Sequence, residues 1–111
     1  MSEKKQLLTG ICASKGIFEG QVHIASDTNL VMPKEKGFIL VCNQTSPAYI
    51  VLLMNSRGVI TEKGGMVSHP AIVSRELGIP CIVGASNATQ LLKQGQKILL
   101  DATNGVVYEL L

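Results

Sequence analysis

The sequence predicts an α/β domain in which short helices cover a mixed sheet. Segments with strand character occur at both ends of the chain, and strands alternate with helices in the middle, which is typical of this fold class. Hydrophobic residues make up 46% of the 111 residues, so one domain spanning residues 1–111 can bury a core. Aromatic residues account for only 4%, and the core must therefore be mainly aliphatic.

The first half of the chain predicts two strands. Val22 and Ile24 alternate with Gln21 and His23, which indicates a strand with one buried face and places His23 on the solvated face. Phe38–Cys42 is apolar throughout, as expected of a strand that is covered on both faces.

A helix and a third strand are predicted next. The segment "AYIVLLMNS" is predicted to be helical, because Thr45 or Ser46 can cap its start and Pro47 suits its first turn. Propensity alone would favour a strand over Ile50–Leu53 instead. Gly58–Thr61 is predicted to be a short buried strand.

A second helix is predicted around "AIVSREL". Ser68 or His69 stands at its cap, and Pro70 occupies the first helical position, where its missing N–H costs nothing. Gly78 ends the helix, and Pro80 prevents it from resuming.

The C-terminal part of the chain predicts three strands and one short helix. Cys81–Gly84 is a buried strand, and "SNATQLLKQG" is a helix with Ser86 as its N-cap and Gly95 at its end. The segments "KILLD" and "VVYEL" form a hairpin joined through "ATNG", in which Asn104 and Gly105 supply the positive φ angles of a tight turn.

Charge and hydropathy argue against several classes of partner. The net charge is only +2, the basic residues are scattered, and few aromatic residues could stack on bases, so no nucleic-acid partner is expected. No apolar stretch approaches the ~20 residues that span a bilayer, and "MSEKKQLLTG" lacks the apolar run of a signal peptide. A soluble cytoplasmic protein without membrane contact is therefore expected.

The three cysteines predict no metal site. Cys12, Cys42 and Cys81 lie far apart in the sequence and show no CxxC spacing. Nothing in the spacing favours a zinc site that uses them with His23 or His69. Because their neighbours are apolar, the cysteines are expected to be small buried hydrophobic residues.

The start of the second predicted helix has the features of an anion site. Backbone N–H groups lack partners at a helix N-terminus, and the helix dipole adds partial positive charge there, so phosphate binds well. Gly64 and Gly65 have no Cβ and let the backbone approach an anion closely, while Ser68 can donate its hydroxyl hydrogen. Arg75 is a nearby cation, although helical spacing does not put it on the face of His69.

His69 can act at such a site as a general base or as a nucleophile. A general base needs a partner, and the adjacent Ser68 rarely points the same way at a helix cap. A nucleophile needs only an unprotonated ring nitrogen, which an ordinary histidine has at neutral pH. The local chemistry therefore favours a phosphorylated His69 over an acid–base one. A histidine that simply stands at a helix cap, without chemistry, is the alternative.

The stretch "TEKGGMVSHPAIVSRELGIPCIVG" (Thr61–Gly84) resembles the signature of the mobile domain of phosphoenolpyruvate-utilising enzymes, the swivelling phosphohistidine domain. The pattern T-x-x-G-G-x-x-S-H-x-A-I-V-x-R-E-x-G-I-P-x-x-V-G fits it throughout. The segments "GICASKGIFEGQV", "FILVCNQTSP" and "NATQLLKQGQKILLDATNGVVYEL" are similar to other parts of that domain. The resemblance covers nearly the whole chain and implies a swivelling β/β/α fold.

The resemblance implies a phosphoryl-carrier domain centred on His69. This residue matches the histidine that accepts a phosphoryl group from ATP or phosphoenolpyruvate on a partner and relays it to a second site, where pyruvate or another acceptor waits. The positions that match the phosphate-stabilising part of the family motif are Thr61, Gly64, Gly65 and Ser68. The positions that match supporting residues are Thr45, Ser46 and Arg75.

Three residues depart from the family pattern. Pro70 stands where alanine or threonine is common, which suits a helix start. Ser74 replaces a frequent alanine. Val67 replaces the threonine that the dikinases use in regulation, so that form of control should be absent here.

The resemblance places the remaining machinery outside this domain. At 111 residues there is no room for the family's ATP-grasp domain or phosphoenolpyruvate-binding barrel. Mg²⁺ and ATP or phosphoenolpyruvate are expected on such nucleotide-binding and phosphoenolpyruvate- or pyruvate-binding partner domains or subunits, and this domain alone should bind no cofactor and turn over no substrate. A non-catalytic regulatory or anion-binding module that keeps the fold is the alternative. The cap geometry disfavours a third function, a hydrolase using Ser68 and His69.

Overall fold

Eight strands form one mixed sheet in the order β1-β8-β7-β3-β4-β5-β6-β2. The structure, a computed structural model, describes residues 4–34 and 37–110. The strands are β1 (Lys4–Thr9), β2 (Ile11–Ser14), β3 (Ile17–Ile24), β4 (Ile39–Cys42), β5 (Gly58–Thr61), β6 (Cys81–Val83), β7 (Lys97–Asp101) and β8 (Val106–Leu110). The helices are the 3₁₀ turn η1 (Pro47–Tyr49) and the α-helices α1 (Ile50–Asn55), α2 (His69–Leu77) and α3 (Ala88–Leu91).

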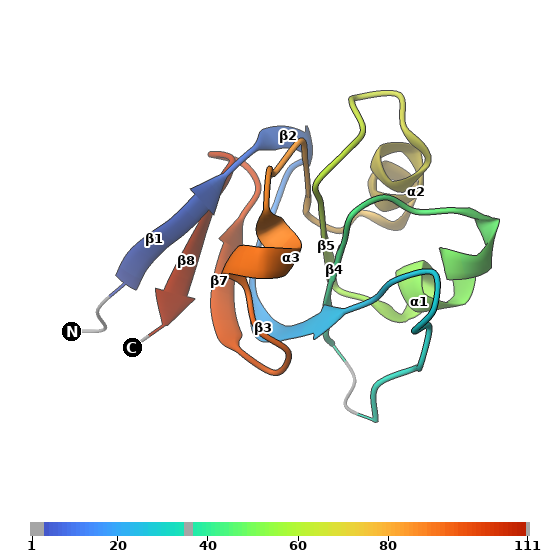
Figure 1. Ribbon diagram of the computed structural model, residues 1–111. Helices are drawn as coiled ribbons and strands as arrows, with labels where there is room; N and C mark the ends of the chain where they lie inside the picture. The colour runs from blue at the N-terminus through green and yellow to red at the C-terminus, as the bar shows by residue number, and fades with distance from the viewer. Residues whose placement is uncertain (1–3, 35–36, 111) are drawn as a thin grey trace.

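The strand β3 joins an antiparallel part of the sheet to a parallel part. Residues 17–21 of β3 pair antiparallel with β7, and residues 22–24 pair in parallel with β4. β5 and β6 continue the parallel part, and β2 lies antiparallel to β6 at its outer edge. The predicted mixed sheet is confirmed, and Figure 1 shows β3 curving from one part to the other.

Two hydrophobic clusters cover the two faces of the parallel strands. Side chains alternate between the faces along each strand, so Ile39 and Val41 belong to one cluster and Leu40 and Cys42 to the other. The first cluster also takes in residues of the antiparallel part, namely Leu8, Ile98, Leu100 and Val107. The second takes in residues of the helices, namely Tyr49, Leu52, Leu53 and Ala71. The layers are therefore β/β/α, with the parallel strands in the middle.

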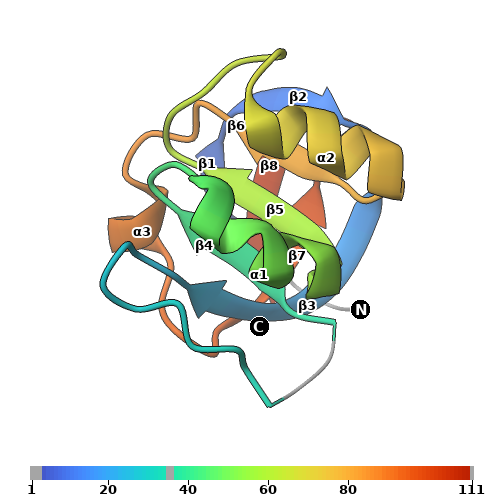
Figure 2. The same cartoon turned by 90° about the vertical axis from the view of Figure 1, so that its right-hand side faces the viewer.

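The helices α1 and α2 lie side by side over one face of the parallel strands, with α2 on the side of β6 and β2 (Figure 2). The helix α3 packs on the other face, where Ala88 and Leu92 join the first cluster. The carboxyl ends of parallel strands meet at one edge of a sheet. The segments 43–46, 62–68 and 84–87 consequently leave the sheet at the same edge.

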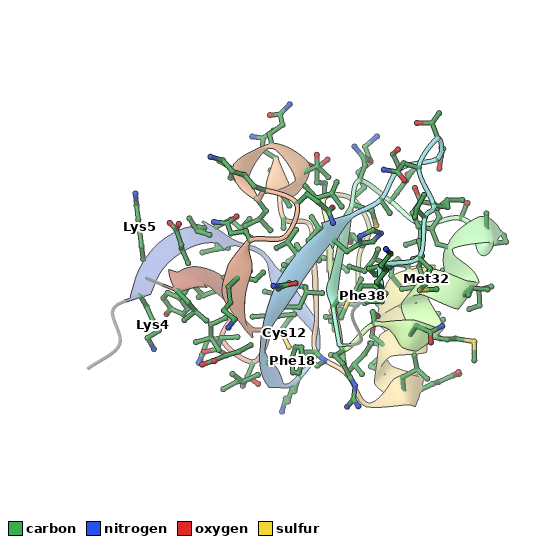
Figure 3. All side chains as sticks on the ribbon, turned by 90° about the horizontal axis from the view of Figure 1, so that it is seen from below. Lys4, Lys5, Cys12, Phe18, Met32 and Phe38 are labelled. Atoms are coloured by element: carbon green, nitrogen blue, oxygen red, sulfur yellow. The ribbon has the colours of Figure 1, made fainter. Side chains whose placement is uncertain are left out.

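The edge strand β1 carries two lysines. Lys4 and Lys5 are exposed and project to opposite sides of the strand, as Figure 3 shows. Charged side chains at a sheet edge disfavour pairing with the edge of another sheet. This edge is therefore protected against strand addition.

The first predicted helix is confirmed, but it begins as a 3₁₀ turn. Ser46 is the N-cap of η1 and has an extended backbone, yet its side chain makes no capping hydrogen bond. The alternative of a strand over Ile50–Leu53 is wrong, because Leu52 and Leu53 pack with Tyr49 from a helix onto the sheet.

The second predicted helix is confirmed with a shift of one residue at its start. Ser68 is the N-cap of α2, so His69 and not Pro70 is the first helical residue. Gly78 ends the helix in the left-handed conformation with φ +71°, and the N–H of Ile79 donates to the carbonyl of Ser74 at 3.0 Å. This is the C-terminal motif that glycine favours.

The prediction that His23 is solvated is wrong, because its side chain is only 6% exposed. Gln94 Oε1 accepts a hydrogen bond from the N–H of Ile24 at 2.8 Å, which turns the Gln94 amide nitrogen toward His23 Nδ1 at 3.1 Å. Nδ1 therefore accepts, and His23 Nε2–H donates to the carbonyl of Val31 at 2.7 Å. Alternation along β3 could not reveal that segments distant from the strand fold over this face.

The third predicted helix is shorter than expected and has a different cap. It covers only Ala88–Leu91, and its N-cap is Asn87 with φ +64° rather than Ser86. The backbone at Leu92 is already extended, so the helix does not continue to Gly95.

The predicted hairpin between β7 and β8 is confirmed, together with its connection "ATNG". The last paired residues are Asp101 and Val106, with residues 102–105 between them. Gly105 has the expected positive φ of +69°, but the positive φ predicted for Asn104 is wrong. The Asn104 side-chain amide donates to the Asp101 carboxylate at 2.9 Å and stabilises the turn.

Candidate functional site

Residues 62–68 connect the end of β5 to the start of α2, whose first residue is His69. β5 is buried along its whole length, whereas the His69 side chain is exposed. This segment, which we call the histidine loop, leaves the carboxyl edge of the parallel strands. Figure 1 shows it rising above the sheet before it enters α2. His69 therefore stands on a projection where a partner could reach its imidazole.

Two hydroxyl groups shape the histidine loop from inside. Thr61 Oγ1 donates to the carbonyl of Lys63 at 2.7 Å, and Ser68 Oγ donates to the carbonyl of Gly65 at 2.7 Å. Gly64 has φ +108°, and a Cβ there would lie 3.1 Å from Ser68 Oγ. Sequence reasoning grouped Thr61, Gly64, Gly65 and Ser68 as phosphate-stabilising residues, and the structure brings all four into this one loop.

Gly65 differs from its neighbour in what its backbone requires. A Cβ at Gly65 would meet nothing within 4 Å, and its φ is not in the left-handed range. Of these two residues, Gly64 is therefore the one whose backbone conformation requires a glycine. The space beside Gly65 leaves the backbone before α2 open to approach.

The N-terminus of α2 has no side-chain cap. The Ser68 hydroxyl faces back to Gly65, so it makes no capping bond to the helix. The first bond of the helix runs from the N–H of Ile72 to the carbonyl of Ser68 at 3.0 Å. A capping side chain would accept hydrogen bonds from the N–H groups of the first turn. Without such a side chain, these N–H groups face the outside of the helix end, beside His69.

Arg75 contacts the histidine loop from within α2. Its guanidinium Nη2 donates to the carbonyl of Met66, so a residue in the second turn of α2 reaches back to the middle of the loop. That Arg75 is not on the face of His69 stays a prediction from helical spacing.

The segment after β4 runs beside the start of the histidine loop. The N–H of Glu62 donates to the carbonyl of Cys42 at 3.1 Å, and the N–H of Lys63 donates to the carbonyl of Asn43 at 2.8 Å. Thr45 follows in this segment, and its Oγ1 is buried without a hydrogen-bond partner among the described residues. A contact of Thr45 or Ser46 with a group on His69 stays a prediction.

Glu62 is a residue of the site that sequence reasoning missed. Its Oε1 accepts from Asn43 Nδ2 at 2.9 Å, and its Oε2 accepts from the N–H and the hydroxyl of Thr89 at 2.8 and 2.7 Å. A sequence signal did exist, because an acidic residue directly after a buried parallel strand stands at the edge where sites form.

Cys42 and Cys81 are buried thiols with raised pKa values. Burial raises the pKa of Cys42 from 9.0 to about 12 and that of Cys81 from 9.0 to about 11. Both are fully buried, as predicted, whereas Cys12 is only half-buried. Within residues 4–34 and 37–110, no group of three His, Cys, Asp or Glu side chains gathers as metal ligands would.

Residues 34–105 match the family described as PEP-utilising enzyme, mobile domain. This match covers well over half of the chain. The chain belongs to that family. The resemblance that Thr61–Gly84 carries is thereby confirmed.

Curated relatives match the chain almost from end to end. A probable phosphoenolpyruvate synthase of Staphylothermus marinus is 44% identical over 98% of this chain, and the phosphoenolpyruvate synthase of Pyrococcus furiosus is 40% identical over 98%. The chain spans only 13% of the length of each of these proteins. An uncharacterised phosphotransferase of Bacillus subtilis, YvkC, is 40% identical over 88% of this chain and 12% of its own length.

Solved structures share the fold of this mobile domain. The solution structure of an Enzyme I protein is 31% identical, with a TM-score of 0.57, over 66% of this chain and 30% of that one. Aconitase X of Thermococcus kodakaraensis reaches a TM-score of 0.66 over 98% of both chains, at 21% identity. The second likeness concerns the fold alone, and a shared fold does not carry a shared function.

No described helix of the mobile domain has the length and apolar character that a membrane crossing requires.

Proposed function

We propose that this mobile domain is a phosphoryl carrier in which His69 holds the transferred group. The observation that carries the proposal is the place of His69, exposed as the first residue of a helix whose N-terminus no side chain caps. A phosphoryl group on the imidazole would lie beside the partial positive charge of that helix end. A helix cap without chemistry would not need an exposed imidazole.

The proposed transfer has two steps that share one intermediate. In the first, the lone pair of an unprotonated His69 nitrogen, Nε2 in this proposal, attacks the phosphorus of the donor. A nitrogen–phosphorus bond forms while the phosphorus–oxygen bond breaks, and the leaving group keeps the electron pair. In the second, an oxygen of the acceptor attacks the same phosphorus, and the imidazole leaves with its lone pair restored. Covalent relay divides one difficult transfer into two easier ones.

The residues around His69 would hold the phosphoryl group in place. The N–H groups at the start of α2 and the backbone at Gly64 and Gly65 are the proposed donors. The Ser68 hydroxyl would join them by turning away from the Gly65 carbonyl that it now contacts at 2.7 Å. Thr61 acts indirectly in this proposal, because its hydroxyl is bound to the Lys63 carbonyl.

The buried Thr45 hydroxyl is the proposed contribution of the neighbouring segment. Its oxygen lacks a partner among the described residues, and an unsatisfied buried hydroxyl is costly. Thr45 or the adjacent Ser46 would donate to the phosphoryl group once it is bound. Arg75 would support the site through the Met66 carbonyl.

Separate partner domains would supply the donor and the acceptor. Because the chain spans 13% of the length of its synthase relatives, most of such an enzyme lies outside this domain. We propose an ATP-grasp-like nucleotide-binding partner and a phosphoenolpyruvate- or pyruvate-binding partner. They would also hold the Mg²⁺ and the nucleotide. The domain alone would bind neither and would complete no turnover.

Intact mass measurement tests the carrier function. The chain is incubated with Mg²⁺ and ATP, or with Mg²⁺ and phosphoenolpyruvate. The Staphylothermus marinus relative is added after deletion of the segment that matches this chain. We expect one acid-labile phosphoryl group per chain, absent from His69→Ala and present in Glu76→Ala. The relative's own segment, added back, shows that the partner is active. No label on the chain beside a labelled control segment, or a label that survives His69→Ala, would refute the proposal.

A non-catalytic anion-binding module is the second candidate. It is favoured by the N-terminus of α2, which has no side-chain cap and whose partial positive charge suits an anion. Such a module would bind inorganic phosphate at the start of α2 without a covalent bond. The mass experiment separates the two, because only the carrier acquires a phosphoryl group.

A further inference from the structure

The Glu62 carboxylate connects three segments that leave the carboxyl edge of the parallel strands. It follows β5, it bonds Asn43 after β4, and it bonds Thr89 in α3, which follows β6. The helices α2 and α3 lie on opposite faces of these strands. Glu62 thus ties the start of the histidine loop to both neighbouring connections at once.

Glu62 also provides the cap that α3 lacks. The N-cap residue Asn87 makes no capping bond with its own side chain. The N–H of Thr89, in the first turn of α3, instead donates to Glu62 Oε2 at 2.8 Å. A bond from a distant segment to this N–H fixes the carboxylate relative to a helix end.

The remaining side-chain hydrogen bonds at the histidine loop do not reach the connections after β4 and β6. The Thr61–Lys63 and Ser68–Gly65 bonds join residues at most three positions apart. The Arg75 bond to Met66 comes from α2, which packs on β2, β5 and β6 and holds the other end of the loop. Within residues 62–68, Glu62 is the residue whose side chain is hydrogen-bonded to the connections after β4 and β6.

We propose that Glu62 is the positioning residue of the phosphoryl-transfer site. Its carboxylate holds the histidine loop so that the Gly64–Gly65 backbone and the start of α2 face the same phosphoryl group. The inference rests on the proposed carrier function. Removal of the carboxylate would release the β5 end of the loop from its bonds to Asn43 and Thr89, and small misplacements of reacting groups cost large factors in rate.

The role is one of geometry rather than charge, and the chain allows the two to be separated. Glu62→Gln keeps an oxygen for the two Thr89 donors and offers an NH₂ group to Asn43, whose amide can turn to present its own oxygen. The neutral variant can thus restore all the bonds without the negative charge. Glu62→Ala removes every bond of the carboxylate.

The test compares the phosphorylation rates of these variants in the mass assay, at a temperature at which circular dichroism shows each variant folded. Glu62→Ala should be slower by about tenfold to a hundredfold, and Glu62→Gln should stay close to the wild type. Glu76→Ala, which removes an exposed carboxylate from α2, is the matched control and should be unchanged. Amide hydrogen exchange of residues 63–68 should accelerate in Glu62→Ala and not in Glu62→Gln.

Several outcomes would overturn the inference. A folded Glu62→Ala variant with the wild-type rate would do so, and so would a Glu62→Gln variant as slow as Glu62→Ala, since charge would then be the cause. If Glu62→Ala does not fold, two other variants replace it: Asn43→Ala removes the amide donor, and Thr89→Ala removes the hydroxyl donor but keeps the N–H donor. Unchanged rates in both, and in the variant that combines them, would overturn the inference. A wild-type chain that is never phosphorylated beside an active control segment refutes the carrier function itself, which is a distinguishable result.

Discussion

Gly64 determines the shape of the histidine loop at the scale of single residues. Its φ of +108° is one that residues with a side chain rarely adopt, and the Cβ of another residue would approach Ser68 Oγ and Ser68 Cβ to 3.1 and 3.2 Å. The Ser68 hydroxyl is held there by the Gly65 carbonyl. A side chain at position 64 must therefore displace Ser68, the N-cap residue of α2.

Gly64→Ala should lower both stability and phosphorylation. The strained backbone should cost about 1–3 kcal/mol in the free energy of unfolding, measured by urea denaturation. Gly65→Ala is the matched control, because open space surrounds that position, and its free energy of unfolding should stay near that of the wild type. Equal losses in the two variants would show that the backbone angle of Gly64 is not the cause.

The family motif identified candidate site residues that lie close together in the sequence. It gave no indication of hydrogen bonds between residues that lie far apart in the sequence. Thr61 to His69 form one loop, so their neighbourhood follows from the chain itself. Glu62 depends on Asn43 and Thr89, which are 19 and 27 residues away. His23 depends on Gln94, which is 71 residues away. The place of Glu62 after a buried strand was a local signal for that residue, but the partners of Glu62 and His23 have no local signal.

At the scale of elements, local signals predicted the central strands and helices well. Apolar runs marked β4, β5 and β6, and the Pro70 and Gly78 positions marked the two ends of α2. The cap of α3 was mispredicted because Ser86 offers a standard N-cap, whereas the N–H of Thr89 is bound by Glu62. In the β7–β8 turn, only the positive φ of Asn104 was mispredicted, because the Asp101 carboxylate holds the Asn104 amide.

Gly78→Ala should destabilise the chain through the end of α2. Gly78 has φ +71°, and a Cβ there would meet nothing within 4 Å, so the backbone angle alone sets the cost. A loss of about 1 kcal/mol in the free energy of unfolding is expected from urea denaturation. Gly78→Asn should lose less, because asparagine tolerates the left-handed conformation. A Gly78→Ala variant as stable as the wild type would contradict this description of the helix end.

At the scale of the whole molecule, the parallel strands are buried between two layers. The antiparallel part of the sheet covers one face and the helices α1 and α2 cover the other. Apolar runs at β4 to β6 predicted this double burial. The site stands at the carboxyl edge of these strands, outside both clusters. The histidine loop is therefore accessible, whereas the strand β5 that precedes it is buried.

The buried thiols make the stability of the molecule sensitive to alkali. Burial raises the pKa of Cys42 to about 12 and that of Cys81 to about 11, from 9.0. Above 9.0 the unfolded thiols lose protons that the folded chain keeps, so stability falls as pH rises toward the folded pKa values. Urea denaturation between about pH 8 and about pH 11 should show this decline.

Cysteine variants provide the control for the alkaline decline. Cys42→Ala and Cys81→Ala should each make the dependence on pH shallower, because each variant removes one buried thiol. A profile that stays flat to about pH 11 would show that the two buried thiols do not contribute.

The site of phosphorylation tests the central claim most directly. The chain, labelled in the presence of the partner protein, is digested and fragmented at alkaline pH, where phosphohistidine survives. We predict the phosphoryl group on His69, bound to Nε2, with none on His23 or Ser68. A phosphoryl group on Ser68 or His23, or an unlabelled His69 beside a labelled control segment, would contradict the carrier function.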